Sequence, residues 1–152
     1  MSLPLLTTRR GYMNEVTAET IVPTWMERVW NQRDASALDD LLTEDSVSHG
    51  LGDPMVGVEP WRQFHAVICG AFSEIHFVVE GQFVSGDHLA ARIKGDMVHR
   101  ATGTPVTMRA MLMGRVVNGR FVEAWNSADW LPALTSLGLV GEDAVARMLG
   151  LA

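Results

Sequence analysis

The feature that most constrains the fold is a pair of long alternating segments joined by Asn118-Gly119. Residues 106–117 and 120–129 both alternate apolar and polar side chains, which is the period of a strand with one buried face. Asn-Gly between two such segments is a strong signal for a two-residue type I′ hairpin. Two further strand patterns precede this hairpin, at residues 76–84 and 88–99. The pattern predicts an antiparallel meander of about four strands.

Three helical patterns precede the strands, at residues 21–30, 34–42 and 59–72. In each, apolar residues recur at the spacing that places them on one helical face. The expected buried stripe of the third helix is Trp61, Phe64, Val67, Ile68, Ala71 and Phe72. Helices followed by strands are typical of α+β domains. We therefore expect a cone-shaped barrel of about three N-terminal helices packed on a curved, mostly antiparallel four- to five-stranded sheet, with an apolar interior suited to a small molecule.

The expected domain spans residues 20–139, after a poorly defined N-terminal segment at 1–19 and before a helical tail at 140–152. A length of 152 residues fits one domain. The net charge of −6 and the lack of a Lys/Arg cluster argue against nucleic-acid binding, since phosphate must be neutralised by a basic face. No segment approaches ~18 uninterrupted apolar residues, and no signal-peptide pattern opens the chain. We expect a cytoplasmic protein with no membrane partner.

Three ionisable residues on apolar strand patterns are the candidates for acid/base chemistry, namely Asp129, His99 and Arg109. Strict alternation puts Asp129 on one face with Phe121 and Trp125. A carboxylate in an apolar pocket has its pKa pushed upward, toward values useful for proton transfer. The same alternation groups Arg109 with Thr107, Met111 and Met113, and it groups His99 with Ile93 and Met97.

Structural alternatives exist for each of these residues. Asp129 precedes a predicted helix, so it could cap that helix rather than act on a ligand. Arg109 could form an ion pair with Glu123 on the neighbouring strand, and His99 could be exposed at a strand end. His65 and His76 are expected at the surface or rim, whereas helix packing and pocket lining are equally open for His49.

Other chemistries have little support in the sequence. The five histidines lack the i, i+2 or i, i+4 spacing of a metal site, and no nucleotide-binding motif occurs. The single cysteine, Cys69, lies in an apolar helical pattern and is interpreted as a buried thiol. We expect no cofactor and no metal.

Four segments together resemble SnoaL-like polyketide cyclases, the ester-cyclase group of the nuclear-transport-factor-2-like superfamily. The first is VWNQRDASALDDLLTEDSVSHG, where W-N-x-x-D ends a helix before a short helix and a strand. The others are GVEPWRQFHAVICGAFSEIHFVVE, GDHLAARIKGDMVHR and VNGRFVEAWNSADWLPALTSLG. The resemblance covers roughly residues 20–139, and its order and spacing are more specific than any one motif.

The resemblance implies a cone-shaped α+β fold that is usually a dimer through the sheet. It also implies intramolecular aldol ring closure without metal or cofactor, with an acidic residue moving the proton. The family's terminal-strand aspartate falls on Asp129, and its histidines fall on His99 and His49; its arginine falls on Arg109. Three departures concern the substrate. The family's longer G-x-P-P-T-G loop is shortened here to residues 100–105, which bears on the pocket mouth; Asn126 replaces a residue that is often charged, and Ala128 stands where a bulky aromatic is common.

We therefore predict a cofactor-independent cyclase acting on a small hydrophobic carbonyl compound, in which Asp129 is the base and His99 or Arg109 stabilises the enolate. The expected substrate-binding residues are His49, Trp30, Phe72, Met97, Met111, Met113 and Trp125. A hydrolase or isomerase on the same fold is one alternative, although Asp96 lies opposite His99 in strand phase and the only tyrosine is Tyr12. A non-catalytic module that binds a hydrophobic ligand is the other, and a homodimer is expected in each case.

Overall fold

A computed structural model describes residues 15–151. The N-terminal elements are α1 (Ile21–Trp25), the π-helix η1 (Met26–Asn31), α2 (Ala37–Leu41), β1 (Leu42–His49), β2 (Met55–Val56) and α3 (Val58–Ala71). The remaining elements are β3 (Phe72–Ser85), β4 (His88–His99), β5 (Pro105–Val117), β6 (Arg120–Asp129), α4 (Leu131–Ser136) and α5 (Ala144–Met148). Tyr12 lies outside the described residues.

The sheet has six strands in the order β2-β1-β6-β5-β4-β3. The four long strands β3 to β6 form the predicted antiparallel meander, and β1 adds to β6 in parallel. The turn between β5 and β6 has φ of 51° at Asn118 and 73° at Gly119, the positive values that a type I′ hairpin requires. The α+β class is confirmed, with one parallel pair and a two-residue strand β2 added to the expected sheet.

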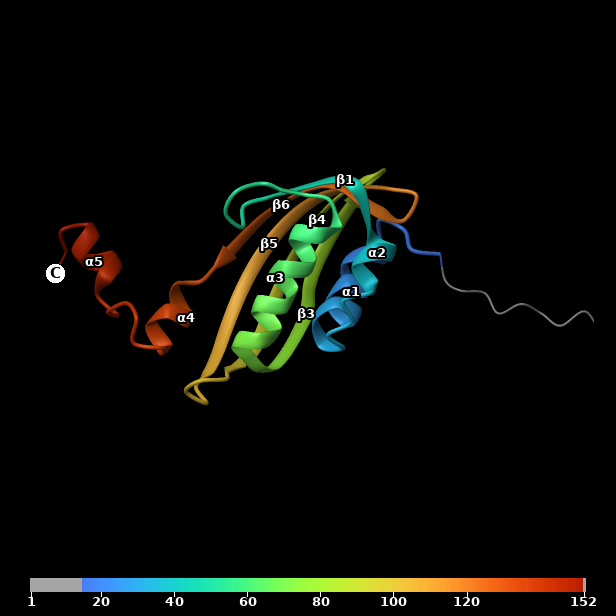
Figure 1. Ribbon diagram of the computed structural model, residues 1–152. Helices are drawn as coiled ribbons and strands as arrows, with labels where there is room; N and C mark the ends of the chain where they lie inside the picture. Colours follow the sequence, from blue (N-terminus) through green and yellow to red (C-terminus); the bar gives the residue numbers. More distant parts are fainter. Residues whose placement is uncertain (1–14, 152) are drawn as a thin grey trace, which may run out of the picture.

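The helices α1, α2 and α3 lie against the concave side of the curved sheet, whereas α4 and α5 lie beyond its end (Figure 1). The core between these layers is fully apolar at its centre. It includes Ile21, Val29, Leu38, Leu41 and Leu42, each 1% exposed or less. At about 1.5–3 kcal/mol for each large aliphatic side chain removed from water, this layer is the main source of stability.

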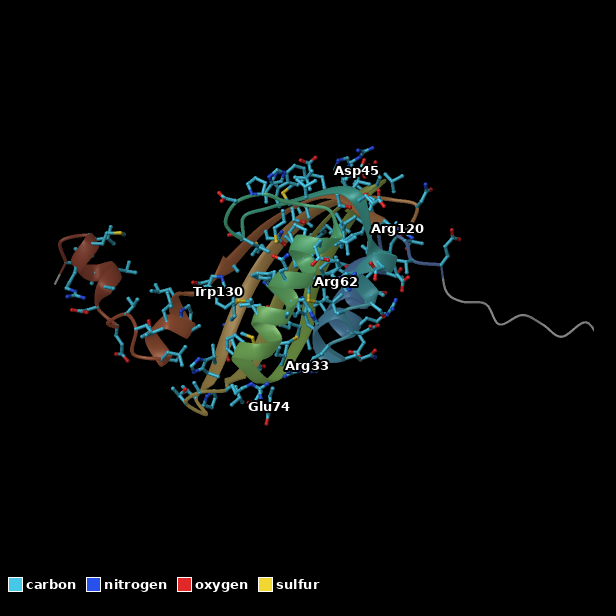
Figure 2. The ribbon with its side chains drawn as sticks, viewed as in Figure 1. Arg33, Asp45, Arg62, Glu74, Arg120 and Trp130 are labelled. Carbon is cyan, nitrogen blue, oxygen red and sulfur yellow. The ribbon has the colours of Figure 1, made fainter. Side chains whose placement is uncertain are left out.

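The segment after η1 ties the helices to β3. The Asn31 amide donates to the Phe77 carbonyl at 3.1 Å and accepts from the Phe77 N–H at 2.7 Å. Arg33, labelled in Figure 2, adopts a left-handed φ of 55° near the end of α3. Its guanidinium donates to the carbonyl oxygens of Cys69, Phe72 and Ser73. The W-N-x-x-D segment therefore fixes how the helical layer packs on the sheet.

A β-bulge in β6 reverses the expected strand phase. Phe121 pairs with Val116 in register, but Glu123 pairs with Arg115, so Val122 is an extra residue between them. An extra residue moves the following side chains to the other face. Phe121 faces the core and so do Ala124, Asn126 and Ala128, whereas Trp125, Ser127 and Asp129 face outward. The expectation that Asp129 shares a face with Phe121 is therefore wrong.

Two further expectations about burial are corrected on α3. His65, expected at the surface, is 5% exposed, because its Nε2–H donates to the Val29 carbonyl of η1 at 2.8 Å. Val67, expected in the buried stripe, is 67% exposed, since Trp61 and His65 form the buried side of α3 instead. Within the described part of the chain, no helix is long and apolar enough to cross a membrane.

Candidate functional site

A cavity of about 100 Å³ lies between the helices and the concave face of the sheet. Its wall is built from α1, η1, β1, α3 and the long strands. Trp130, labelled in Figure 2, belongs to this wall and follows the last residue of β6, where the chain turns toward α4. The wall residues are Val22, Trp25, Met26, Trp30, Leu42, Ser48, Leu51, Trp61, Phe64, Ile68, Phe77, Ile93, Met97, Met108, Ala110, Met111, Leu112, Phe121, Ala124, Asn126, Ala128 and Trp130.

Aromatic rings hold one another in place around the helical side of this cavity. The Trp25 and Trp61 ring centroids are 4.9 Å apart at 76°, an edge-to-face pair. Trp61 also meets Phe64 edge to face at 5.6 Å, and Trp30 lies 5.9 Å from Phe77. Such pairs stabilise by about 0.5–1.5 kcal/mol beyond burial, so this part of the wall is rigid and preformed.

The cavity wall is electrically neutral. Among the described residues 15–151, no Asp, Glu, His, Lys, Arg, Tyr or Cys lines it. Its side-chain polar groups are the Ser48 hydroxyl, the Asn126 amide and tryptophan indoles. The indole Nε1–H of Trp61 donates to Ser48 Oγ at 2.8 Å, and Asn126 Nδ2 donates to the His49 carbonyl at 3.0 Å. The wall can therefore form neutral hydrogen bonds, but it offers no counterion to a charged ligand.

Asp129 and Arg109 lie opposite each other on β6 and β5, on the outer face of the sheet. Both side chains are exposed, and neither lines the cavity. Asp129 Oδ1 accepts from the N–H of Leu131, the first residue of α4, at 3.2 Å, so the carboxylate satisfies one free N–H at the start of this helix, whose N-cap position is Trp130. The structure brings these two residues together in register, but outside the cavity. Their expected catalytic role stays a prediction.

His99 ends β4, and it does not reach the cavity wall either. Its Nδ1 lies 2.9 Å from Thr102 Oγ1 in the following turn, and its ring meets Phe72 edge to face at 6.0 Å. On the outer face of β4, Asp96 accepts hydrogen bonds from Lys94 and Thr107, which hold the pKa of its carboxyl below the usual range. The prediction that Asp96 and His99 lie on opposite faces agrees with this placement.

His49 forms an outer cluster with Glu123 and Trp125. Its Nε2 lies 3.0 Å from Glu123 Oε1, and its ring stacks on Trp125 at 5.6 Å and 16°. Glu123 therefore pairs with His49, and the ion pair considered between Arg109 and Glu123 is not formed. Because β1 runs parallel to β6 with His49 beside Trp125, the two rings lie on the same outer face.

The expected substrate-binding residues divide between the two faces of the sheet. Trp30 and Met97 line the cavity. Met111 borders it, but its side chain is 65% exposed on the outer face, in register with Ser127. Phe72 is buried in the core but does not line the cavity. His49, Met113 and Trp125 do not line the cavity either. These residues therefore do not all surround one pocket: the bulge in β6 turns Trp125 outward, and Met113 lies on the exposed face of β5.

Neither Ser48 nor Asn126 was predicted to line the pocket, although both belong to its wall. Along β1, strand alternation puts Ser48 on the face opposite to Val47 and His49. If Val47 is assigned to the outer face, this alternation predicts that Ser48 faces the cavity. Asn126 required knowledge of the bulge. On the helical side, burial raises the pKa of the Cys69 thiol, consistent with a largely inert thiol. The described residues contain no group of three or more His, Cys, Asp or Glu side chains arranged to hold a metal ion.

A family model for SnoaL-like polyketide cyclases matches residues 20–137. IdmH from Streptomyces antibioticus, proposed to be a polyketide cyclase, is 26% identical with a TM-score of 0.72, over 80% of this chain and 98% of that chain. A proposed SnoaL-like polyketide cyclase from Jannaschia sp. CCS1 is 18% identical with a TM-score of 0.72, over 88% and 99% of the two chains. The latter likeness shows the fold alone. An NTF2-like protein from Exiguobacterium sp. 255-15 has the same fold, at 21% identity and a TM-score of 0.61 over 72% of this chain and 98% of that chain. No curated protein matched the sequence.

Proposed function

Because the chain belongs to the SnoaL-like polyketide cyclase family, we propose that its cone cavity binds a small, neutral, mostly apolar molecule that carries a ring. The observation that supports this proposal is the composition of the wall: aromatic, methionine and aliphatic side chains, with no titratable group among the described residues. Ligand pockets are typically apolar with a few placed polar groups, and this wall fits that description.

The volume of the cavity limits the size of the ligand, and the absence of charged groups in its wall limits the ligand's charge. A cavity of about 150 Å³ lined by Leu, Ile and Phe stays dry and binds benzene, so one of about 100 Å³ is of the order of a single ring. A carboxylate or ammonium moved into such a wall would lose its hydration without gaining a counterion, which is strongly unfavourable.

Isothermal titration calorimetry with p-xylene and p-cresol tests this proposal. We expect both to bind with a one-to-one stoichiometry, whereas p-toluate, which has the same ring and a carboxylate, should bind at least tenfold more weakly. Measurable binding of p-toluate equal to that of p-xylene would contradict a neutral site. Binding of none of the three would contradict the proposal itself.

Ring closure on the bound molecule is a second candidate, favoured by the family match and by the position of Asp129 next to the wall residue Trp130. In this reaction a carboxylate takes the proton from a carbon between two carbonyls, and the enolate carbon then bonds to a carbonyl carbon whose oxygen is protonated. One positioned base contributes about 10²–10⁴ in rate. For Asp129 to act, its carboxylate has to leave Leu131 and turn toward the cavity.

Two substitutions distinguish a catalytic role of Asp129, as the base, from a structural role in capping the start of α4. Asp129→Asn keeps an oxygen that can accept from Leu131 but removes the base, whereas Asp129→Ala removes both. If Asp129 is the base, both variants lose turnover of an aromatic β-diketo ester. If it is only a cap, Asp129→Asn keeps both turnover and melting temperature, and only Asp129→Ala is less stable.

A homodimer through the outer face of the sheet remains part of this proposal. Large apolar side chains are exposed on that face, and covering them would favour association. They include Val78, Met111, Met113 and Trp125. Sedimentation velocity should give twice the monomer mass, and Met113→Lys should shift the equilibrium toward monomer. A monomer at micromolar concentration would contradict this part of the proposal.

A further inference from the structure

One corner of the cavity wall is polar, and it lies where β1 meets β6. Ser48 pairs in register with Ala124, and Asn126 lies two residues further along the same inner face of β6. Both side chains belong to the cavity wall. The two polar groups are therefore diagonal neighbours on adjacent strands, while the rest of the wall is apolar or aromatic.

The Ser48 hydroxyl has an unused hydrogen. Ser48 is 3% exposed, and its oxygen accepts the Trp61 indole N–H at 2.8 Å. A hydroxyl carries one donor hydrogen besides its acceptor lone pairs. Within residues 15–151 the hydroxyl donates to no acceptor. Burying a donor without a partner is unfavourable, so an acceptor brought in by a ligand would gain affinity there.

The Asn126 amide is held in one orientation. Its Nδ2 donates to the His49 backbone carbonyl at 3.0 Å, which directs that nitrogen to the end of β1. The other amide atom, Oδ1, is an acceptor and makes no hydrogen bond within the described part of the chain. Ser48 thus supplies a donor and Asn126 an acceptor at neighbouring points of the wall.

We propose that Ser48 and Asn126 together bind a neutral hydroxyl group, a phenol or enol, on the ring of the ligand, and that this pair determines specificity. A hydroxyl can accept from the Ser48 hydroxyl and donate to Asn126 Oδ1 at once. A ketone or ether can use only Ser48, and an ionised phenolate would lack the proton that Asn126 accepts. This inference rests on the proposed ligand-binding function and names the chemical class of the ligand.

The test compares p-cresol with p-xylene, which differ only by a hydroxyl in place of a methyl group. Ser48→Ala alone would leave the Trp61 N–H unpaired, so Ser48→Ala is introduced into a Trp61→Phe background and compared with Trp61→Phe. The measured quantity is the affinity ratio of p-cresol to p-xylene, which cancels changes in cavity size. We expect the added Ser48→Ala to lower this ratio about five- to tenfold, the effect of one neutral hydrogen bond.

Asn126→Leu provides an independent variant in the wild-type background, and it should lower the same ratio by a similar factor. Ser127→Ala, on the outer face of the same strand, is the matched control and should leave the ratio unchanged. An unchanged ratio in both the Ser48→Ala and Asn126→Leu comparisons would overturn the inference. If neither p-cresol nor p-xylene binds to the wild-type protein, the proposed function fails first, so the two failures are distinguishable.

Discussion

Substitutions at Ala128 and Ser127 test directly whether the bulge at Val122 determines which side chains of β6 face the cavity. The structure directs Ala128 into the cavity wall and Ser127 outward, where it pairs in register with Met111. Phenylalanine at either position is the same chemical change, one residue apart on the same strand. Uninterrupted alternation from Phe121 would place Ser127 inside and Ala128 outside. The two variants therefore give opposite results under the two strand phases.

The expected magnitudes follow from the volume of the cavity. The cavity of about 100 Å³ is of the order of a single ring, so a phenyl group at position 128 takes the space that a ring-bearing ligand needs. Ala128→Phe should abolish binding of p-cresol and p-xylene. Crowding of the wall should destabilise the protein by about 1–3 kcal/mol, which lowers Tm by about 2–4 °C per kcal/mol for a chain of this length. Ser127→Phe should change stability by less than about 0.5 kcal/mol.

The two strand phases of β6 are distinguished by calorimetric titration and thermal unfolding of both variants and of the wild-type protein. We expect Ser127→Phe to bind both ligands as tightly as the wild type and Ala128→Phe to bind neither while remaining folded. If Ser127→Phe blocks binding and Ala128→Phe does not, the bulge is misplaced and the outward position of Asp129 is refuted with it. If both variants bind normally, the ligands occupy a site other than this cavity.

Three further predictions concern the frame around the site. Gly50→Ala should sharply lower Tm and weaken ligand binding, because φ is 88° there and an added Cβ would overlap the Asn126 carbonyl oxygen; an unchanged Tm would contradict this packing. The Lys94 hydrogen bond lowers the pKa of Asp96 in the folded protein, so its stabilising effect is complete above the unfolded value of about 3.9 and is lost as the pH falls through the lower folded value. Between pH 5 and pH 2, the free energy of unfolding of Asp96→Asn should therefore fall less steeply than that of the wild type. Equal slopes for the two proteins would argue against this contribution. Deleting residues 139–152 should leave Tm within about 2 °C at a concentration where the chain is monomeric, because α5 has no buried residue; a larger drop would show that the tail packs on the body.

Much of the fold could be predicted because its signals are local. The observed bounds of β4 and β6 are those predicted, residues 88–99 and 120–129, since each strand is bracketed by turn residues. The Asn118-Gly119 turn is likewise confirmed by its positive φ angles. The parallel pairing of β1 with β6 was not predicted, because it joins segments more than 70 residues apart and no local pattern encodes it.

The candidate site was harder to predict, because one residue decides which side chains enter it. Nothing in the alternation of Phe121-Val122-Glu123-Ala124 marks Val122 as the extra residue, since either phase places apolar side chains on the core face. His65 was misplaced for a similar reason: its partner is a carbonyl of the π-helix, which is a tertiary contact. Sequence periodicity identifies a strand more reliably than it identifies the inner face beyond a bulge.

The bulge also determines where two of the three departures from the family pattern lie. Asn126 and Ala128 differ from the charged and bulky residues common at these positions, and the structure places both in the cavity wall. A small side chain at 128 leaves space next to Trp130, and a neutral amide at 126 removes a charge from the interior. Both changes alter the shape and polarity that a ligand meets, but neither affects the hairpin or the core. The departures therefore bear on which molecule binds, and calorimetry of Ala128→Phe and Asn126→Leu measures the two effects separately.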